Sequence, residues 1–251
     1  MRNLKLEIEY DGTNYCGWQA QNSCPLSVVR RPSVQETIEK TLRKILQEKI
    51  RLIASGRTDA GVHARRQIAN FKTASNIALK KLQRALNALL PEDITIARIE
   101  EKNLDFNSRF DAQSKIYRYT ILNRKYPSAL LRNTVYFYPY PLNIKLMQSQ
   151  AKVLLGCHNF KSFQASDKIV RDAVRTIKRI KITKDNDLIY IDIEADGFLY
   201  NMARNIVGTL LEIGRARFPK GYLKKLLLLK NRKLAGPTVP AKGLCLLEVR
   251  Y

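Results

Sequence analysis

Apolar and polar residues alternate at the start of the chain, as they do in a strand with one buried face. From Leu4 to Tyr10 every second residue is apolar and most of the others are charged. A helix is predicted next, because Ser33 begins a capping box that ends at Glu36 and an apolar stripe at helical spacing follows. The other elements predicted in this half are a strand over 67–71, a helix from about 76 that stops at Pro91, and a strand over 94–99.

The same order of elements begins again near Lys115. The pattern predicts helices over 143–155 and 199–213 and strands over 116–122, 174–182, 188–195 and 244–251. Two mixed halves, each with antiparallel strands and two helices, predict an α+β protein. We place the boundary between Glu101 and Phe110, which gives an N-terminal subdomain over 1–105 and a C-terminal subdomain over 106–251.

The charge of the chain is strongly one-sided. It holds 45 Lys plus Arg residues against 22 Asp plus Glu residues, a formal net charge of +23. This excess indicates a polyanionic partner, nucleic acid rather than a membrane surface. No apolar run approaches the roughly 18 residues of a membrane span, and no N-terminal signal region is visible. We therefore predict a cytoplasmic protein that binds nucleic acid and no membrane.

Cysteine and histidine give no spacing typical of a metal site. No Cys-x-x-Cys pair occurs, and neither histidine adds a zinc-type spacing to the four cysteines, which are Cys16, Cys24, Cys157 and Cys245. We interpret the cysteines as thiols of a reducing compartment. The sequence predicts no metal site.

The loop from Gly56 to His63 is the strongest candidate for chemistry. It places Arg57 and Asp59 two residues apart, between glycines that allow a tight turn. A carboxylate beside guanidinium groups stays ionised at neutral pH, as a nucleophile or base requires. The same pattern also fits ordinary turn chemistry, in which Asp59 accepts backbone hydrogen bonds and Arg57 forms a surface ion pair.

Further segments favour the chemical interpretation, because with this loop the chain resembles the bacterial TruA-type tRNA pseudouridine synthases over essentially its full length. The Gly-Arg-Thr-Asp-Ala-Gly-Val-His run is close to diagnostic for that family. One departure is the segment from Asn22 to Pro32, which is longer and more basic than is usual there. The other matching segments are 8–12, 17–19, 33–35, 117–119, 196–202, 204–208 and 240–244.

The resemblance implies isomerisation of uridine to pseudouridine in the anticodon stem-loop of tRNA, at positions 38–40, without metal, nucleotide or redox cofactor. It also implies a homodimer, and two subdomains that flank a central basic cleft. By the family motif Asp59 is the nucleophile and Arg204 the cation near it. Tyr117 is the active-site tyrosine, Arg57 fills the space of the flipped base, and Leu244 is an apolar wall of the uracil pocket.

Each assignment has a plainer alternative. On pattern alone, Arg204 fits a solvated charge on a helix face equally well. On the same ground, Tyr117 fits a core residue of a strand. Leu244 as strand core is nearly the same statement as Leu244 in a pocket wall. We interpret His63 as the partner in a structural hydrogen bond, without a role in proton transfer. We interpret the amphipathic run 220–233 as core packing with a basic outer face.

Two other functions explain the sequence less completely than an isomerase does. A non-catalytic tRNA-binding or RNA-binding protein on the same scaffold would have the same basic charge, but it would not need a carboxylate amid residues that face phosphates. An aspartate-dependent hydrolase would need a second carboxylate or a metal at suitable spacing, which the sequence does not offer.

Overall fold

The computed structural model describes residues 1–19, 31–165 and 172–251. Cys24 and most of the longer, basic segment 22–32 lie outside the described residues. The chain forms two compact units. The first holds Met1–Gln113 together with Leu246–Tyr251, and the second holds Ser114–Cys245.

The first unit is built on a sheet in the order β4-β1-β3, next to which the residues of β10 that belong to this unit continue. The short strand β2 pairs antiparallel with β3. β1 pairs antiparallel with both of its neighbours. The strands are β1 (Arg2–Tyr10), β2 (Ile53–Ala54), β3 (His63–Thr73), β4 (Ile94–Lys102) and β10 (Leu244–Arg250).

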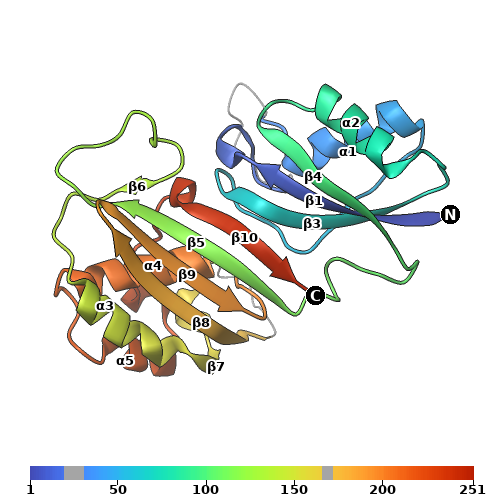
Figure 1. The fold of residues 1–251 in the computed structure, drawn as a ribbon. Coiled ribbons are helices and arrows are strands. Elements are labelled where there is room, and N and C mark those ends of the chain that lie inside the picture. The colour runs from blue at the N-terminus through green and yellow to red at the C-terminus, as the bar shows by residue number, and fades with distance from the viewer. Residues whose placement is uncertain (20–30, 166–171) are drawn as a thin grey trace. The chain divides into compact units, whose positions relative to one another are not determined.

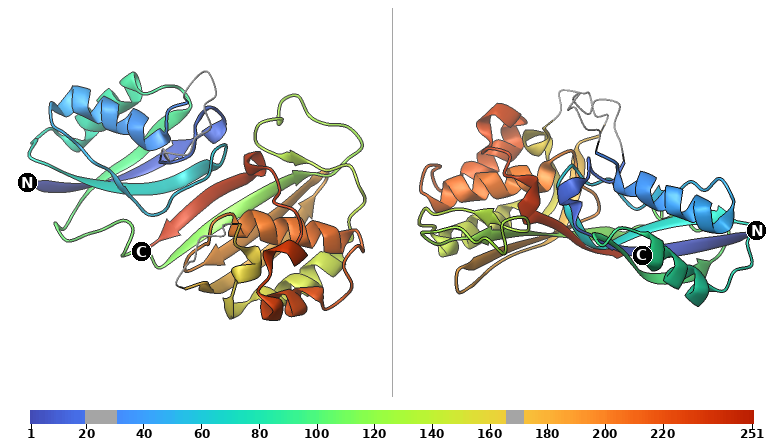
Figure 2. Two further views of the ribbon diagram at one scale, coloured as in Figure 1. Left: turned by 180° about the vertical axis from the view of Figure 1, so that it is seen from behind. Right: turned by 90° about the horizontal axis from the view of Figure 1, so that it is seen from above.

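Alternation along β1 produces the core of this unit, as the sequence predicts. Leu4 lies opposite Phe71 and Leu6 opposite Ala69 of β3, and all four side chains are buried. Two helices, α1 (Val34–Leu46) and α2 (Leu79–Leu89), pack on the sheet (Figures 1 and 2). α1 begins where predicted, because the Ser33 hydroxyl accepts a hydrogen bond from the Glu36 amide at 3.1 Å.

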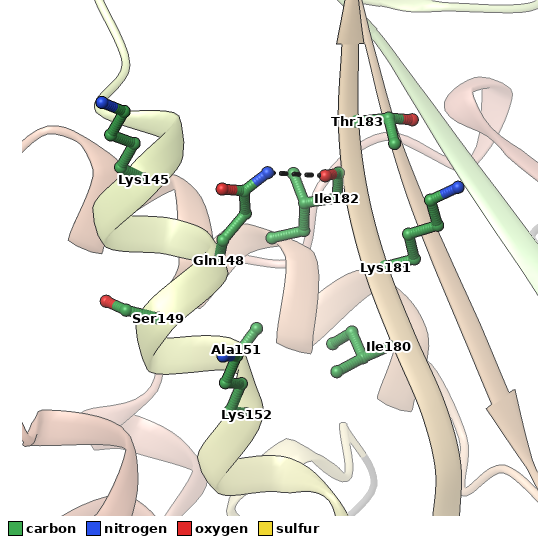
Figure 3. A pocket seen from close by; sticks show the side chains of 9 residues that line it. All are labelled: Lys145, Gln148, Ser149, Ala151, Lys152, Ile180, Lys181, Ile182 and Thr183. Atoms are coloured by element: carbon green, nitrogen blue, oxygen red, sulfur yellow. Dashed lines mark hydrogen bonds between the residues drawn. The ribbon is translucent and has the colours of Figure 1, made fainter.

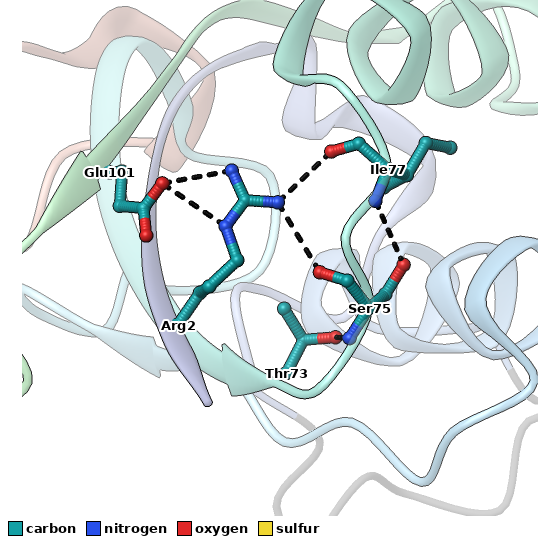
Figure 4. Close-up of polar contacts among 5 residues, drawn as sticks. All are labelled: Arg2, Thr73, Ser75, Ile77 and Glu101. Atoms are coloured by element: carbon teal, nitrogen blue, oxygen red, sulfur yellow. Dashed lines mark hydrogen bonds and ion pairs between the residues drawn. The ribbon is translucent and has the colours of Figure 1, made fainter.

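Arg2 joins three segments of the first unit (Figure 4). Its guanidinium donates to Glu101 of β4 at 2.9 and 3.1 Å, and to the backbone oxygens of Ser75 and Ile77 at 3.3 and 3.0 Å. Ser75 and Ile77 lie in the connection between β3 and α2. The Arg2 side chain therefore fixes the start of β1 to β4 and to this connection.

In the second unit the strand order is β5-β9-β8-β7, with the short strand β6 parallel to β5. β8 and β9 form the predicted hairpin, and Asn186 in its turn has a left-handed φ of 50°. The strands are β5 (Ser114–Leu122), β6 (Tyr136–Phe137), β7 (Gly156–Asn159), β8 (Val174–Asp185) and β9 (Leu188–Ala195).

Three helices pack on the sheet of the second unit: α3 (Ile144–Ala151), α4 (Met202–Gly214) and α5 (Tyr222–Leu229) (Figure 1). α3 is shorter than predicted, because its last turn tightens into a 3₁₀ turn over Lys152–Leu154. In α5 the buried leucines are Leu223, Leu226 and Leu227, whereas Leu228 is 74% exposed. The amphipathic run 220–233 therefore packs part of its leucines into the core.

Mixed helices and largely antiparallel strands confirm the predicted α+β class. Among the described residues, no helix has both the length and the apolar composition that crossing a membrane requires. The subdomains 1–105 and 106–251, defined by their parts in catalysis, stay a prediction.

Candidate active site

The loop that carries Asp59 joins β2 to β3, and buried hydrogen bonds fix its start. The Ser55 amide donates to the backbone oxygen of Ile68 at 2.8 Å. The buried Gln67 accepts from the Ser55 hydroxyl at 2.7 Å and donates to the backbone oxygen of Gly56 at 2.9 Å. The loop therefore leaves β2 along a defined path.

The backbone around Asp59 is fixed as well. The Trp18 amide donates to the Thr58 oxygen at 3.1 Å, and the Val62 amide donates to the Asp59 oxygen at 3.1 Å. The hydroxyls of Thr58 and Tyr10 share a buried hydrogen bond of 2.8 Å. On this support the Asp59 side chain is half-buried, whereas Arg57 is exposed. The structure therefore presents a carboxylate from a loop with a fixed backbone, with an exposed cation two residues away.

Two glycines before the loop allow the chain to pass directly behind it. A Cβ atom on Gly12 would lie 2.0 Å from the Val62 oxygen. A Cβ atom on Gly17 would lie 2.6 Å from the Thr58 oxygen and 3.1 Å from the Asp59 carbonyl carbon, and Gly17 has a φ of +101°. Both glycines lie in segments that carry the family resemblance, but the sequence does not predict their contact with the Asp59 loop.

His63 has the structural position expected of it. Its Nδ1 atom lies 3.1 Å from the Gly12 amide and 3.0 Å from Oδ1 of Asp11. Burial raises the pKa of Asp11, but the hydrogen bonds from Thr13 and the proximity of His63 together lower it, so the net pKa is lowered. His63 thus ties the start of β3 to the turn after β1.

In the second unit, Tyr117 and Tyr119 lie on the same face of β5. The Tyr117 ring is 7% exposed and packs edge-on against Phe198, with ring centroids 4.9 Å apart. The Tyr119 hydroxyl donates to the Pro240 oxygen at 2.7 Å, and burial raises the pKa of Tyr119. The burial of Tyr117 is compatible with both the core and the active-site interpretation.

Arg204 is not the solvated helix-face charge of the plainer interpretation. It is half-buried near the start of α4. Its Nε donates to the Val239 oxygen at 2.8 Å, and one Nη donates to Oδ1 of Asn201 at 2.8 Å. Asn201 precedes the helix with a left-handed φ of 58°. The guanidinium is therefore held by neutral oxygens on two sides.

Leu244 begins β10, directly after a 3₁₀ turn over Ala241–Gly243. The side chain is 6% exposed. The turn packs on Tyr119, because a Cβ on Gly243 would lie 2.6 Å from Cζ of that ring. Tyr117, Arg204 and Leu244 thus belong to three elements of the second unit, and the first unit holds Arg57 and Asp59 on one loop.

A groove of about 520 Å³ lies between α3 and β8 in the second unit (Figure 3). The Gln148 side chain in its wall donates to the Ile182 oxygen at 2.9 Å. Lys145, Lys152 and Lys181 are at its lining, and none of the predicted site residues is. The three lysines give the lining a positive charge, which suits a surface for a polyanion.

Known proteins resemble this chain over its full length. A family model described as tRNA pseudouridine synthase matches residues 7–111 and 150–251. The chain is 47% identical to the tRNA pseudouridine synthase A of Clostridium acetobutylicum and 46% identical to the tRNA pseudouridine synthase A 2 of Clostridium perfringens. Against that of Acetivibrio thermocellus it is 43% identical, and all three similarities cover 100% of both chains.

The family model and these relatives define an RNA-modifying enzyme of the isomerase class. The chain belongs to the tRNA pseudouridine synthase family. The predicted resemblance is confirmed, and the family favours the enzyme over a non-catalytic RNA-binding protein.

Proposed function

We propose that this enzyme converts uridine to pseudouridine in the anticodon stem-loop of tRNA, at positions 38–40, with Asp59 as its nucleophile. The observation that carries the proposal is the half-buried Asp59 side chain on a loop whose backbone is bonded on both sides of it. Such support holds a reacting group in place without reorganisation at the moment of reaction. The enzyme works in the cytoplasm as a homodimer, as the resemblance implies.

The isomerisation breaks the bond between uracil N1 and ribose C1′ and forms a bond between uracil C5 and the same carbon. Asp59 attacks C1′ or C6, or helps to remove a proton. The C5 proton leaves once the new bond has formed, and N1, released from C1′, takes up a proton, so that the product is an isomer of the substrate. Arg204 supplies the positive charge that keeps this carboxylate ionised. In the proposal residues 1–105 provide the Asp59 loop, and residues 106–251 provide Tyr117, Arg204 and Leu244.

Three residues handle the base. Arg57, which is exposed, enters the space that the flipped uridine leaves and stacks on neighbouring bases. Tyr117 stacks on the extruded uracil, and its hydroxyl accepts or relays the C5 proton. Leu244 forms the apolar wall beside the uracil.

The test is incubation of the protein with unmodified tRNA transcripts, followed by chemical mapping of pseudouridine. Pseudouridine at positions 38–40 would support the proposal. Modification at other positions alone would contradict the assigned region, and tight binding without any pseudouridine would contradict the assigned reaction.

Arg57 and Tyr117 are expected to fail at different steps. Arg57→Ala should slow base flipping, so a transcript with an unpaired target uridine should recover part of the lost rate, because flipping then costs less. Tyr117→Phe keeps the ring and removes only the hydroxyl, so turnover should fall with little change in binding, whatever the pairing of the target. Single-turnover kinetics on paired and unpaired targets measure both. Equal recovery of the two variants would show that at least one role is misassigned.

Binding of tRNA should weaken steeply as salt is added, with a slope that corresponds to several phosphate contacts, because lysine and arginine release counterions from the RNA. We include the groove lysines among these contacts. The double variant Lys145→Glu/Lys181→Glu should lower the slope by about two. Lys80→Glu/Lys81→Glu on α2 changes the net charge equally and is the matched control. Equal effects of the two double variants on the slope would exclude the groove as a specific contact.

A further inference from the structure

The segment 235–240, which we call the α4 strap, crosses α4 in the second unit at backbone contact. A Cβ atom on Gly208 of the helix would lie 1.8 Å from the Pro237 oxygen. A Cβ atom on Gly236 of the strap would lie 2.6 Å from the Thr209 amide nitrogen. The Thr209 hydroxyl accepts a hydrogen bond from the Gly236 amide at 2.9 Å. Helix and strap therefore have one defined mutual position.

Three side chains fasten the strap to the helix. Asn205, fully buried on α4, accepts at Oδ1 from Nη2 of Arg232 at 3.0 Å and from the Thr238 hydroxyl at 2.6 Å. Nη2 of Arg232 also donates to Oγ1 of Thr238 at 3.0 Å. The three polar groups thus bond to one another in a closed triangle. We call Arg232, Asn205 and Thr238 the strap cluster.

Arg232 reaches further along the strap. Its Nη1 donates to the Gly236 oxygen at 2.9 Å and to the Ala235 oxygen at 3.4 Å. Burial lowers the pKa of Arg232, and its hydrogen bonds in the described part of the chain go to neutral oxygens. A half-buried cation among neutral acceptors gains little net stability. The planar fork of the guanidinium is instead suited to fixing the shape of the loop that it spans.

The end of the strap contacts the predicted site. The backbone oxygen of Val239, the residue after Thr238, accepts a hydrogen bond from Nε of Arg204 at 2.8 Å. Arg204 precedes Asn205 on α4, so two consecutive helix residues bond to two consecutive strap residues. The strap therefore supplies one of the hydrogen bonds that orient the Arg204 guanidinium, beside the bond to Asn201.

We propose that the strap cluster is a positioning device that sets the Arg204 guanidinium for catalysis. Arg232, Asn205 and Thr238 act through the Val239 oxygen and do not touch the substrate. The inference rests on the proposed function, in which Arg204 supplies positive charge to the reaction. It adds that this charge is useful only when the strap holds it in one direction.

Thr238 offers a matched pair of variants. Thr238→Val keeps the shape of the side chain and removes the hydroxyl, whereas Thr238→Ser keeps the hydroxyl. We expect Thr238→Val to lower the single-turnover rate constant at saturating enzyme about tenfold, the equivalent of roughly one hydrogen bond. The Kd for tRNA should stay within about twofold, and Thr238→Ser should stay near the wild-type rate. Assays are run well below the measured unfolding temperature of each variant.

The comparison of Thr238→Val with Thr238→Ser separates positioning from simple loss of stability, because only the first variant lacks the hydroxyl that bonds to Asn205. A wild-type rate in Thr238→Val would overturn the inference. So would equal losses in both Thr238 variants.

A second measurement does not depend on activity. The Nε–H resonance of Arg204, identified by its loss in Arg204→Lys, should exchange with solvent about tenfold faster in Thr238→Val, because the Val239 oxygen is displaced. Unchanged exchange would overturn the inference. If the wild-type protein formed no pseudouridine, the proposed function would fail, and this measurement would still decide whether the cluster positions Arg204.

Discussion

Asp59→Asn should reduce pseudouridine formation by more than about a thousandfold, because the amide keeps the shape of the carboxylate and removes the charge that makes it a nucleophile. Affinity for tRNA should stay within about tenfold, since phosphate contacts elsewhere carry the binding. Single-turnover assays and binding titrations with one unmodified transcript measure both quantities.

The matched control is Asp192→Asn. Asp192 is also half-buried, and Arg118 donates to its two oxygens at 2.7 and 2.8 Å. Arg118 alternates with Tyr117 on β5, so this pair lies on the opposite face of the strand. The control should lose some stability and keep its turnover within about threefold. A similar loss of turnover in both variants would show that the Asp59 effect is not specific.

Gly17→Ala should damage the enzyme without altering any reacting group. The new methyl group would lie 2.6 Å from the Thr58 oxygen, at a residue whose φ is +101°. Strain and crowding together should lower the free energy of unfolding by about 2–4 kcal/mol. Because the crowded atoms belong to the Asp59 loop, turnover should also fall more than about tenfold. Urea unfolding and single-turnover kinetics measure the two effects.

Gly221→Ala separates backbone strain from crowding. Gly221 has a φ of +85°, close to that of Gly17, but nothing lies within 4 Å of the added atom. It should lose about 1–2 kcal/mol of stability and keep its turnover. If Gly17→Ala retained as much turnover as Gly221→Ala, the contact behind the loop would have no part in placing Asp59.

Local pattern was sufficient for most of the fold. The alternation before Tyr10 and the cap at Ser33 each depend on residues close together in the chain, and both elements appear as predicted. β6 and β7 were not predicted, because strands of two and four residues are too short to show a period.

The candidate site divides in the same way. The Asp59 loop is found from the sequence because its residues are contiguous. The closeness of Gly17 to Thr58, or of Arg232 to Asn205, depends on how distant segments pack, and no local pattern carries that information. The strap in particular is rich in glycine and proline and has no period.

The division of β10 between the units has a consequence for synthesis. The first unit is completed only by residues 246–251, whose Tyr251 hydroxyl donates to the Ser108 oxygen at 2.9 Å and whose Arg250 oxygen accepts from the Gln113 amide at 2.8 Å. A ribosome makes the whole of Ser114–Cys245 before these residues exist. Until then the edge of β3 lacks its final neighbour, an exposed template for wrong pairing. The unit that is begun first is therefore finished last, and the nascent chain depends on its final strand for protection against aggregation.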